Sequence, residues 1–93
     1  MVDKKNWSLY IIECKDRSLY CGITNNLEKR LILHKTGKAS RYTRGRLPVK
    51  LVHSEKNLTR SEALKKEIKI KKLPKMRKRE YIKTKGRRFR FEL

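Results

Sequence analysis

Residues 19–37 contain three side chains that can do acid–base or anion chemistry at close spacing. Tyr20 and Gly22 lie in an apolar run typical of a short strand, and Arg30 and His34 follow in a segment with helical periodicity. Arg30 and His34 each come three residues after an apolar position, so they border the predicted buried stripe of that helix. A guanidinium and an imidazole beside a phenol can bind an anion. The alternative is an amphipathic helix with solvated charges at its edge.

A second candidate is Glu67, which stands among lysines in the segment 60–73. It lies next to the apolar positions of a predicted helix, so we expect its carboxylate to face protein or a cleft. The other charged residues in 65–72 are all lysines. Hard divalent ions prefer carboxylate oxygen, which makes Glu67 a candidate metal ligand. A structural ion pair with one of the lysines is the alternative.

Basic residues gather in two stretches that could contact phosphates. Residues 38–50 contain five basic residues and no acid, and residues 69–90 contain twelve basic residues and one acid. Cations for phosphates and a ring for a base or sugar characterise surfaces that track a nucleic-acid strand, whereas a plain solvated loop is the alternative for 38–50. The predicted nucleic-acid contacts are Lys38, Arg41, Tyr42, Arg44, Arg46, Lys71, Lys72 and Lys78.

The net charge points to a polyanionic partner. There are 28 Lys and Arg against 9 Asp and Glu, a net charge of +19, and such an excess disfavours a compact state unless a polyanion is bound. DNA is the expected partner and RNA is not excluded. No helical segment has the Trp-, Phe- and Leu-rich face of a membrane-surface protein, and no run is a transmembrane span or signal peptide, so we expect no membrane partner.

The two cysteines carry no metal-binding or redox motif. Cys14 and Cys21 have neither CxxC spacing nor a Cys/His cluster around them. We expect them on neighbouring strands as small apolar residues, with a disulfide as the minor alternative. This pattern is typical of a reduced, cytoplasmic protein.

Ninety-three residues are enough for one small domain. The apolar and β-branched runs 7–14 and 19–23 predict two strands joined as a hairpin. The expected third strand is 48–54, with Pro48 at its start. The number of residues in the hairpin turn decides whether Tyr10 and Tyr20 share a face, and the sequence alone leaves this open.

Helix boundaries follow from capping residues. The first helix is expected to begin near Asn25, with Glu28 three residues on, and to end at Gly37. Thr59 and Glu62 match a capping box that opens the next helix. Pro74 ends it, and a short helix over 75–84 follows. The tail 86–93 interleaves two phenylalanines with arginines, which fits either a DNA-tracking arm or an edge strand.

In this order, the motifs resemble those of the GIY-YIG nuclease domain from about residue 8 to residue 82. Ser8-Leu9-Tyr10 stands where the family has Gly-Ile-Tyr, and Tyr20-Cys21-Gly22 stands for Tyr-Ile-Gly. Arg30, His34 and Glu67 match the family's helix arginine, the histidine one turn later and the metal-binding glutamate. Gly37, Tyr42-Thr43, Pro48-Val49 and Leu51-Val52 resemble the middle of the domain. The chain is most similar to the small stand-alone bacterial GIY-YIG proteins, whose role is undefined.

The resemblance implies an α/β (α+β) fold. It predicts a single small domain with a three-stranded antiparallel sheet flanked by helices, in the order β-β-α-β-α-α. The nuclease-like domain would span residues 1–85, and residues 86–93 would form a basic, aromatic tail. Both tyrosines must then share one face, so the resemblance selects the odd-residue turn.

The resemblance also implies phosphodiester hydrolysis with one Mg²⁺ or Mn²⁺ ion, held by Glu67. Arg30 would neutralise charge on the phosphate, and Tyr10 would accept a proton or orient the water. A free tyrosine pKa near 10 makes it a poor base, so a nearby cation must favour its anionic form. The implied catalytic residues are Tyr10, Tyr20, Arg30, His34 and Glu67.

The expected function is a divalent-metal-dependent DNA endonuclease in repair or recombination. Its specificity would be weak or structural, for nicked, branched or single-stranded DNA. Two departures from the family pattern are Ser8 in place of glycine and the absence of an asparagine from 72–85, where Lys78 stands instead. The alternative is therefore a catalytically weak or inactive nucleic-acid-binding module. An RNA-associated structural protein would explain the charge, but not the ordered motif residues.

Overall fold

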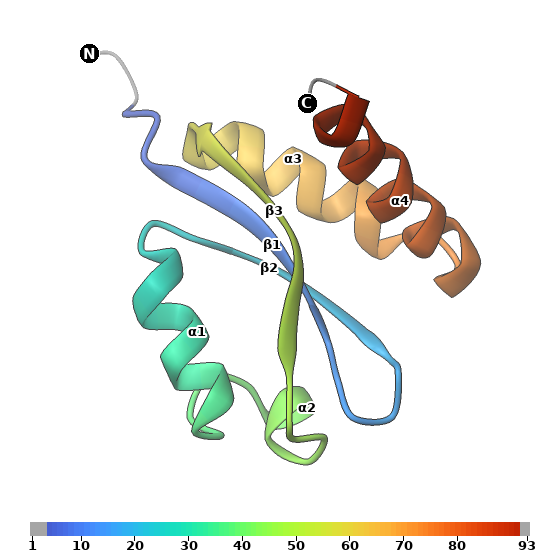
Figure 1. The fold of residues 1–93 in the computed structure, drawn as a ribbon. Coiled ribbons are helices and arrows are strands. Elements are labelled where there is room, and N and C mark those ends of the chain that lie inside the picture. Colours follow the sequence, from blue (N-terminus) through green and yellow to red (C-terminus); the bar gives the residue numbers. More distant parts are fainter. Residues whose placement is uncertain (1–3, 92–93) are drawn as a thin grey trace.

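The computed structural model describes the backbone of residues 4–91 and the side chains of residues 4–84. This part of the chain forms one three-stranded antiparallel sheet with helices on both faces (Figure 1). The elements are β1 (Trp7–Glu13), β2 (Leu19–Thr24), α1 (Leu27–Lys35), α2 (Arg41–Arg44), β3 (Lys50–Leu58), α3 (Arg60–Lys71) and α4 (Lys75–Phe91). The predicted fold class and element order are confirmed, with the short α2 added before β3.

Strand β1 is the centre of the sheet, in the order β2-β1-β3. It pairs with β2 so that Tyr10 lies opposite Gly22 and Ile12 lies opposite Tyr20. Tyr10 and Tyr20 therefore share a face, because side chains two residues apart on a strand point the same way. The turn that joins the strands spans residues 14–18, an odd number, so the choice implied by the resemblance is confirmed.

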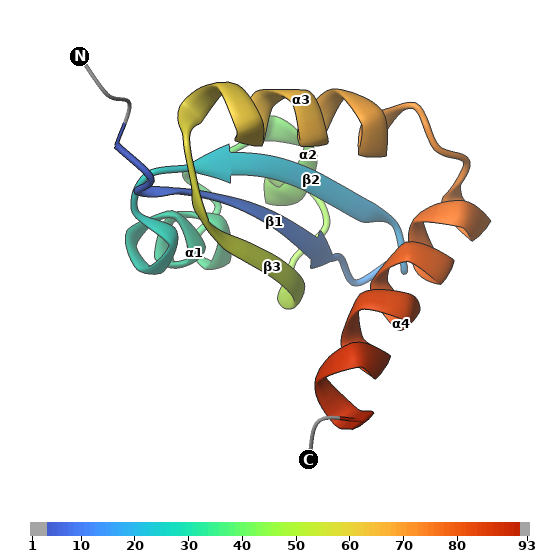
Figure 2. The same cartoon turned by 90° about the horizontal axis from the view of Figure 1, so that it is seen from above.

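The two faces of the sheet carry separate cores. On one face, Leu9, Ile11 and Cys21 pack with Ile70 of α3 and with Tyr81 and Ile82 of α4. On the other, Tyr10, Ile12 and Tyr20 pack with Leu27 and Leu31 of α1. Figure 1 shows α3 and α4 on one side of the strands and α1 and α2 on the other. Seen from above, α3 lies along the sheet, and α4 leaves it at an angle (Figure 2).

The helix caps confirm most of the sequence pattern. Thr59 and Glu62 form the predicted capping box at the start of α3. Gly37 follows α1 with a φ of 76°, a left-handed conformation that suits glycine. The start of α1 differs from the prediction, since the cap is Asn26 and its side chain accepts a hydrogen bond from the Lys29 amide at 3.1 Å. The Thr24 hydroxyl accepts from the Asn26 amide, which leaves Asn25 in the turn.

Two further boundaries were predicted wrongly. Strand β3 begins at Lys50 instead of Pro48 and runs to Leu58, because its pairing with β1 extends from Glu13 to Trp7. Helix α4 continues to Phe91 instead of ending at 84, so the backbone of 86–91 is helical and is not an edge strand. The alternative of a DNA-tracking arm stays a prediction. Residues 92 and 93 of the predicted tail lie outside the described residues. No helix in the described part is long and apolar enough to cross a bilayer.

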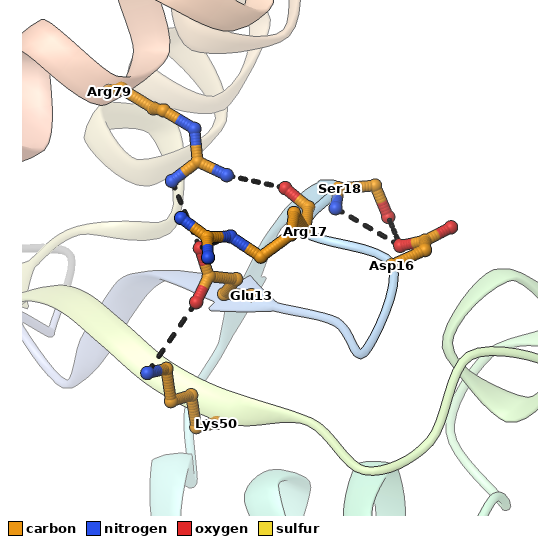
Figure 3. A network of polar contacts seen from close by, with 6 residues as sticks. All are labelled: Glu13, Asp16, Arg17, Ser18, Lys50 and Arg79. Atoms are coloured by element: carbon orange, nitrogen blue, oxygen red, sulfur yellow. Dashed lines mark hydrogen bonds and ion pairs between the residues drawn. The ribbon is translucent and has the colours of Figure 1, made fainter.

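A charged cluster anchors α4 to the hairpin end of the sheet (Figure 3). The Glu13 carboxylate accepts a hydrogen bond from Arg79 at 2.9 Å and lies 3.5 Å from Lys50 and 3.6 Å from Arg17. Arg79 also donates to the carbonyl of Arg17. The hydrogen bond from Arg79 is the main reason that the pKa of Glu13 lies below its ordinary value. One carboxylate thus joins β1, β3, the hairpin turn and α4.

Candidate active site

His34 is the centre of a buried polar line on the α1 side of the sheet. Its Nε2 lies 2.8 Å from Tyr10 Oη, and its Nδ1 lies 2.9 Å from Thr43 Oγ1. Strand β1, helix α1 and helix α2 each supply one member. The sequence placed His34 at the edge of the buried stripe, but the side chain is 0% exposed. Its burial is possible because both ring nitrogens have hydrogen-bond partners.

Aromatic rings lead outward from His34 toward solvent. The ring centroid of Tyr20 is 5.2 Å from that of His34 and 6.5 Å from that of Tyr10. Tyr42, 37% exposed, stacks on Tyr20 at 5.9 Å, and the Arg46 guanidinium lies 3.9 Å from the Tyr42 ring centroid. Tyr10 is only 1% exposed, whereas Tyr20 is half-buried. Tyr20 is therefore the phenol of the pair that lies nearer to solvent.

Gly22 makes room for the Tyr10 side chain. A Cβ atom at this position would lie 2.5 Å from Tyr10 Oη and 2.7 Å from Tyr10 Cζ. The sequence left open whether this glycine marks a bulge, a close approach or a tolerated substitution. The structure shows a close approach, in which the phenol of β1 lies against the backbone of β2.

Burial sets the protonation of the Tyr10–His34 pair. Desolvation lowers the pKa of His34, and the charge of Arg30 lowers it further, so the imidazole is neutral at pH 7. Desolvation raises the pKa of Tyr10 far above its usual range, and Tyr20 adds to the rise. Arg30 acts in the opposite direction on Tyr10, but burial is the larger cause. Tyr10 is thus a protonated phenol next to a neutral imidazole.

Arg30 lines an open depression and also acts electrostatically on the buried pair. Its side chain is half-buried on α1, and its charge acts on the pKa of both Tyr10 and His34. The depression has a volume of about 310 Å³ and is lined by Thr24, Asn25, Asn26, Lys29, Arg30 and Leu33. An anion that entered there would meet a guanidinium, a shape suited to bidentate binding of phosphate.

Glu67 comes from the opposite side of the sheet, on α3. Its side chain is 16% exposed, as expected for an acid that faces protein or a cleft, and it forms an ion pair with Lys71 at 3.3 Å. Glu67 raises the pKa of both Tyr10 and Cys21, and burial is the first cause that raises the Cys21 thiol to about 12. Its charge therefore acts on groups of both faces of the sheet, because Cys21 and Tyr10 belong to opposite cores.

A single carboxylate with a lysine beside it limits which metals fit. The described residues contain no group of three or more His, Cys, Asp or Glu side chains that could hold an ion. Zinc sites in proteins need three or four such ligands. Mg²⁺, in contrast, keeps several waters and is commonly held by one or two carboxylates plus substrate phosphates. Glu67 fits an ion of that kind.

The predicted nucleic-acid contacts fall into two groups. Lys38, Arg41 and Arg44 are exposed around α2, and Lys71 and Lys72 are exposed at the end of α3. Lys78 is half-buried on α4, where its charge lowers the pKa of Cys21. Arg46 has protein partners, since it donates to Asp16 at 3.0 Å and to the carbonyl of Tyr42 at 3.0 Å.

Thr43 is a member of the buried line that was not among the predicted functional residues. It is 0% exposed and contacts His34 directly. The one signal was its place in the Tyr42-Thr43 pair of the family pattern, within a basic segment that shows no helical periodicity. Cys14 and Cys21 are both free and buried, as expected, and they belong to the cores of opposite faces. Only Cys21 lies on a strand, because β1 ends at Glu13 and Cys14 opens the turn.

Comparison with known families gives the same assignment as the motif residues. The family model for the GIY-YIG catalytic domain matches residues 6–86. This chain belongs to the GIY-YIG family. The match includes every residue of the Tyr10–His34–Thr43 line, Arg30 and Glu67. GIY-YIG domains are nuclease domains that act on DNA and generally use a divalent metal.

Relatives of this GIY-YIG domain are small bacterial proteins. A UPF0213 protein of Oceanobacillus iheyensis is 49% identical over 74 residues, which cover 80% of this chain and 86% of the relative. The UPF0213 protein YazA of Bacillus subtilis is 40% identical over 84 residues, covering 90% of this chain and 85% of YazA. The name UPF0213 assigns no activity to these relatives.

Two solution structures share the fold. The UPF0213 protein of Bacillus halodurans has a TM-score of 0.58 and 38% identity, covering 86% of this chain and 85% of that one. A protein of E. faecalis has a TM-score of 0.62 and 42% identity, covering 92% of each chain.

Proposed function

We propose that the protein is a divalent-metal-dependent endonuclease that hydrolyses phosphodiester bonds in DNA. The observation that carries this proposal is the buried hydrogen bond between Tyr10 Oη and His34 Nε2, with Arg30 beside it, in a chain of a nuclease family. A buried phenol–imidazole pair can accept a proton from an attacking water. An adjacent guanidinium can bind the phosphate that this water attacks. The site therefore combines a proton path with an anion site.

Proton transfer from Tyr10 to His34 would allow a tyrosine with a high pKa to act as the base. Burial keeps Tyr10 protonated, so the phenolate is not its resting state. It can accept a proton from water only while its own proton passes to His34 Nε2. Because Tyr10 is 1% exposed, the water must enter beside the half-buried Tyr20, which orients it at the rim. The water O–H bond breaks as the water oxygen bonds to phosphorus, and the P–O bond to the leaving ester oxygen breaks. Tyr10 takes the water proton as its own proton passes to His34 Nε2. The leaving oxygen takes a proton from solvent, and His34 returns its extra proton to solvent through Tyr10.

Arg30 and Glu67 would have the two remaining roles, which are stabilising the phosphate charge and holding the metal ion. Arg30 stabilises the negative charge that grows on the phosphate oxygens in the transition state. Glu67 would hold one Mg²⁺ or Mn²⁺ ion, and Lys71 would yield its place on the carboxylate when the ion binds. Such an ion supplies polarisation of the phosphate and stabilisation of the leaving oxygen.

We propose DNA with weak or structural specificity as the substrate: nicked, branched or single-stranded forms met in repair and recombination in the cytoplasm. The proposal rests on exposed cations around α2 and at the end of α3, together with the net charge of +19. Cations bind phosphates and carry no base information, so this surface favours shape over sequence. RNA competes for the same surface on charge alone.

A DNA-binding module with little or no turnover is the second candidate. Two observations favour it: Glu67 already has an ion-pair partner in Lys71, and Tyr10 is almost fully buried. The family resemblance adds a further reason, since it implies Lys78 at the position where many members carry an asparagine. Such a module would bind DNA with the same salt dependence and cleave nothing.

A nicking assay on supercoiled plasmid and a branched oligonucleotide separates the two candidates. Wild type, Glu67→Ala and Arg30→Ala are compared in Mg²⁺, Mn²⁺ and EDTA, with Glu80→Ala as a control because this carboxylate is 63% exposed on α4. We expect metal-dependent nicking by wild type. The nicking rate should fall about 10²- to 10³-fold in Glu67→Ala and Arg30→Ala and stay unchanged in Glu80→Ala.

Binding measured in the same samples completes the test. Glu67→Ala should bind DNA about as tightly as wild type, because it removes a metal ligand and no phosphate contact. Nicking that survives in Glu67→Ala, or a large loss of its affinity for DNA, would contradict the assignment of Glu67. Tight binding by wild type without cleavage in any metal would support the binding module instead.

A further inference from the structure

We propose that Thr43 is a positioning residue that fixes His34 as the Nδ1–H tautomer, leaving Nε2 free to accept the Tyr10 proton. The proposal rests on the proposed function and adds to it a residue outside the predicted set. Its starting point is that both nitrogens of a fully buried imidazole have partners, Tyr10 on one side and Thr43 on the other.

The hydrogens along this line can be arranged in two ways. In the first, Thr43 donates to Nδ1, so Nε2 must carry the hydrogen and donate to Tyr10 Oη. The Tyr10 hydrogen then needs another acceptor inside the core, and a buried hydroxyl without one costs about 1–3 kcal/mol. This arrangement also leaves His34 unable to take a proton from Tyr10.

In the second arrangement, every hydrogen has an acceptor. Tyr10 donates to Nε2, Nδ1–H donates to Thr43 Oγ1, and the Thr43 hydroxyl donates to the carbonyl of Ser40 at 3.4 Å. A threonine hydroxyl can accept and donate at once, so a single side chain connects the imidazole to the backbone. The second hydrogen bond of the histidine sets which nitrogen is free, and here Thr43 supplies it.

The hydrogen bonds at the start of helix α2 position Thr43 against His34. Ser40 caps it by accepting the Tyr42 amide at 3.1 Å, and the Ser40 carbonyl accepts the Arg44 amide at 3.0 Å. Thr43 itself is 0% exposed beneath the turn. The short helix therefore delivers one buried hydroxyl to His34, while its flanking arginines, Arg41 and Arg44, remain exposed.

Replacing Thr43 by valine removes the hydroxyl and keeps the shape. The Ser40 carbonyl still accepts the Arg44 amide, so the buried group that loses its partner is His34 Nδ1–H. Thr43→Ser restores the hydroxyl. Thr36→Val is the matched control, because Thr36 lies two residues from His34 and bonds only to the Ile32 and Leu33 carbonyls among the contacts described.

The test is long-range ¹H–¹⁵N NMR of the histidine rings, run on the full chain at pH 7. We expect wild type, Thr43→Ser and Thr36→Val to show His34 protonated on Nδ1 alone, and Thr43→Val to lose that single state. Wild-type protein with His34 protonated on Nε2 would overturn the proposal. This readout needs no cleavage and no variant, so it stands even if the nuclease assignment fails or Thr43→Val does not fold.

Cleavage kinetics give the second readout. We expect kcat for DNA nicking to fall about 10- to 100-fold in Thr43→Val with KM unchanged, and to recover in Thr43→Ser. Folded Thr43→Val that keeps the wild-type kcat would overturn the positioning role. If wild type cleaves no DNA, the proposed function fails, and the NMR result alone decides the tautomer.

Discussion

Tyr10 combines core packing with a proposed role in proton transfer. It belongs to the core of the α1 face and also bonds to His34 at 2.8 Å. Full burial raises its pKa, which would make it a worse base if it acted alone. The neutral imidazole behind it changes this, because a coupled transfer needs no standing phenolate. In the proposed mechanism the pair therefore acts as one unit, and neither residue transfers the proton by itself.

Substitution of Gly22 tests directly whether the Tyr10–His34 pair depends on the close contact between the Tyr10 phenol and this glycine. In Gly22→Ala, the new Cβ would lie 2.5 Å from Tyr10 Oη, so the phenol must move away from His34. We expect a loss of about 1–3 kcal/mol in the free energy of unfolding, measured with urea, and a loss of DNA nicking. Gly45→Ala is the control, since nothing lies within 4 Å of its Cβ position and its φ is −81°. Gly22→Ala with wild-type stability and cleavage would contradict the close approach.

Sequence reasoning reached some of these residues and missed others for identifiable reasons. The motif order predicted Tyr10, Tyr20, Arg30, His34 and Glu67, and the odd turn places the two tyrosines on one face. Helical periodicity put His34 at the edge of the stripe, because periodicity treats histidine as polar and does not register that both ring nitrogens are bonded. Thr43 gave almost no signal, since a hydroxyl in a basic loop is ordinary until the fold brings it to His34.

At the scale of elements, the capping box and the hairpin were predictable, whereas the extent of β3 was not. The Thr59–Glu62 capping box and the glycine after α1 follow from local rules. The start of β3 at Lys50 depends on pairing with Glu13 of β1, which no local pattern contains. Helix α2 is four residues long, too short for periodicity to reveal.

The Glu55 carboxylate, with its hydrogen-bond and ion-pair partners, joins β3 to α3 and α4. Glu55 accepts hydrogen bonds from His53 at 2.9 Å and from Tyr81, and it lies 3.0 Å from Lys66. The hydrogen bond from His53 is the first cause that lowers the pKa of Glu55 to about 2, while burial opposes it. The side chain is 17% exposed, so solvent screens these contacts only in part.

This depressed pKa predicts the acid response of the fold. The folded-state pKa lies below the ordinary value of 4.5, so Glu55 stabilises the protein above pH 4.5, and the effect is lost as pH falls toward 2. Glu55→Gln should cost on the order of 3 kcal/mol in the free energy of unfolding at pH 7, and the cost should shrink between pH 4.5 and 2. Urea unfolding at each pH measures it, with the exposed Glu80→Gln as control. A cost that does not change with pH would contradict the pairing.

For the whole molecule, charge dominates the encounter with DNA. With a net charge of +19, even nonspecific attraction is strong, so affinity alone says little about where DNA lies. The slope of affinity against salt is more informative, because it counts the phosphates that are neutralised.

Two triple variants locate the binding surface. Lys38, Arg41 and Lys72 are exposed members of the two predicted groups, and Lys5, Lys56 and Lys65 are exposed lysines outside them. Changing either set to alanine removes three charges, so the long-range field falls equally. We expect the first set to reduce the slope of log K against log salt for duplex DNA by up to about 3, and the second set to change it little. Equal slopes in the two variants would place the DNA elsewhere.

The most direct test of the proposed nuclease mechanism is single-turnover cleavage of branched DNA by Tyr10→Phe in Mg²⁺, with DNA affinity measured in parallel. The ring keeps its packing, and only the hydroxyl between Gly22 and His34 is removed. The mechanism predicts a cleavage rate at least about 10²-fold lower than that of wild type, at an unchanged Kd. Cleavage by Tyr10→Phe at the wild-type rate, or wild-type protein that binds and never cleaves, would contradict it.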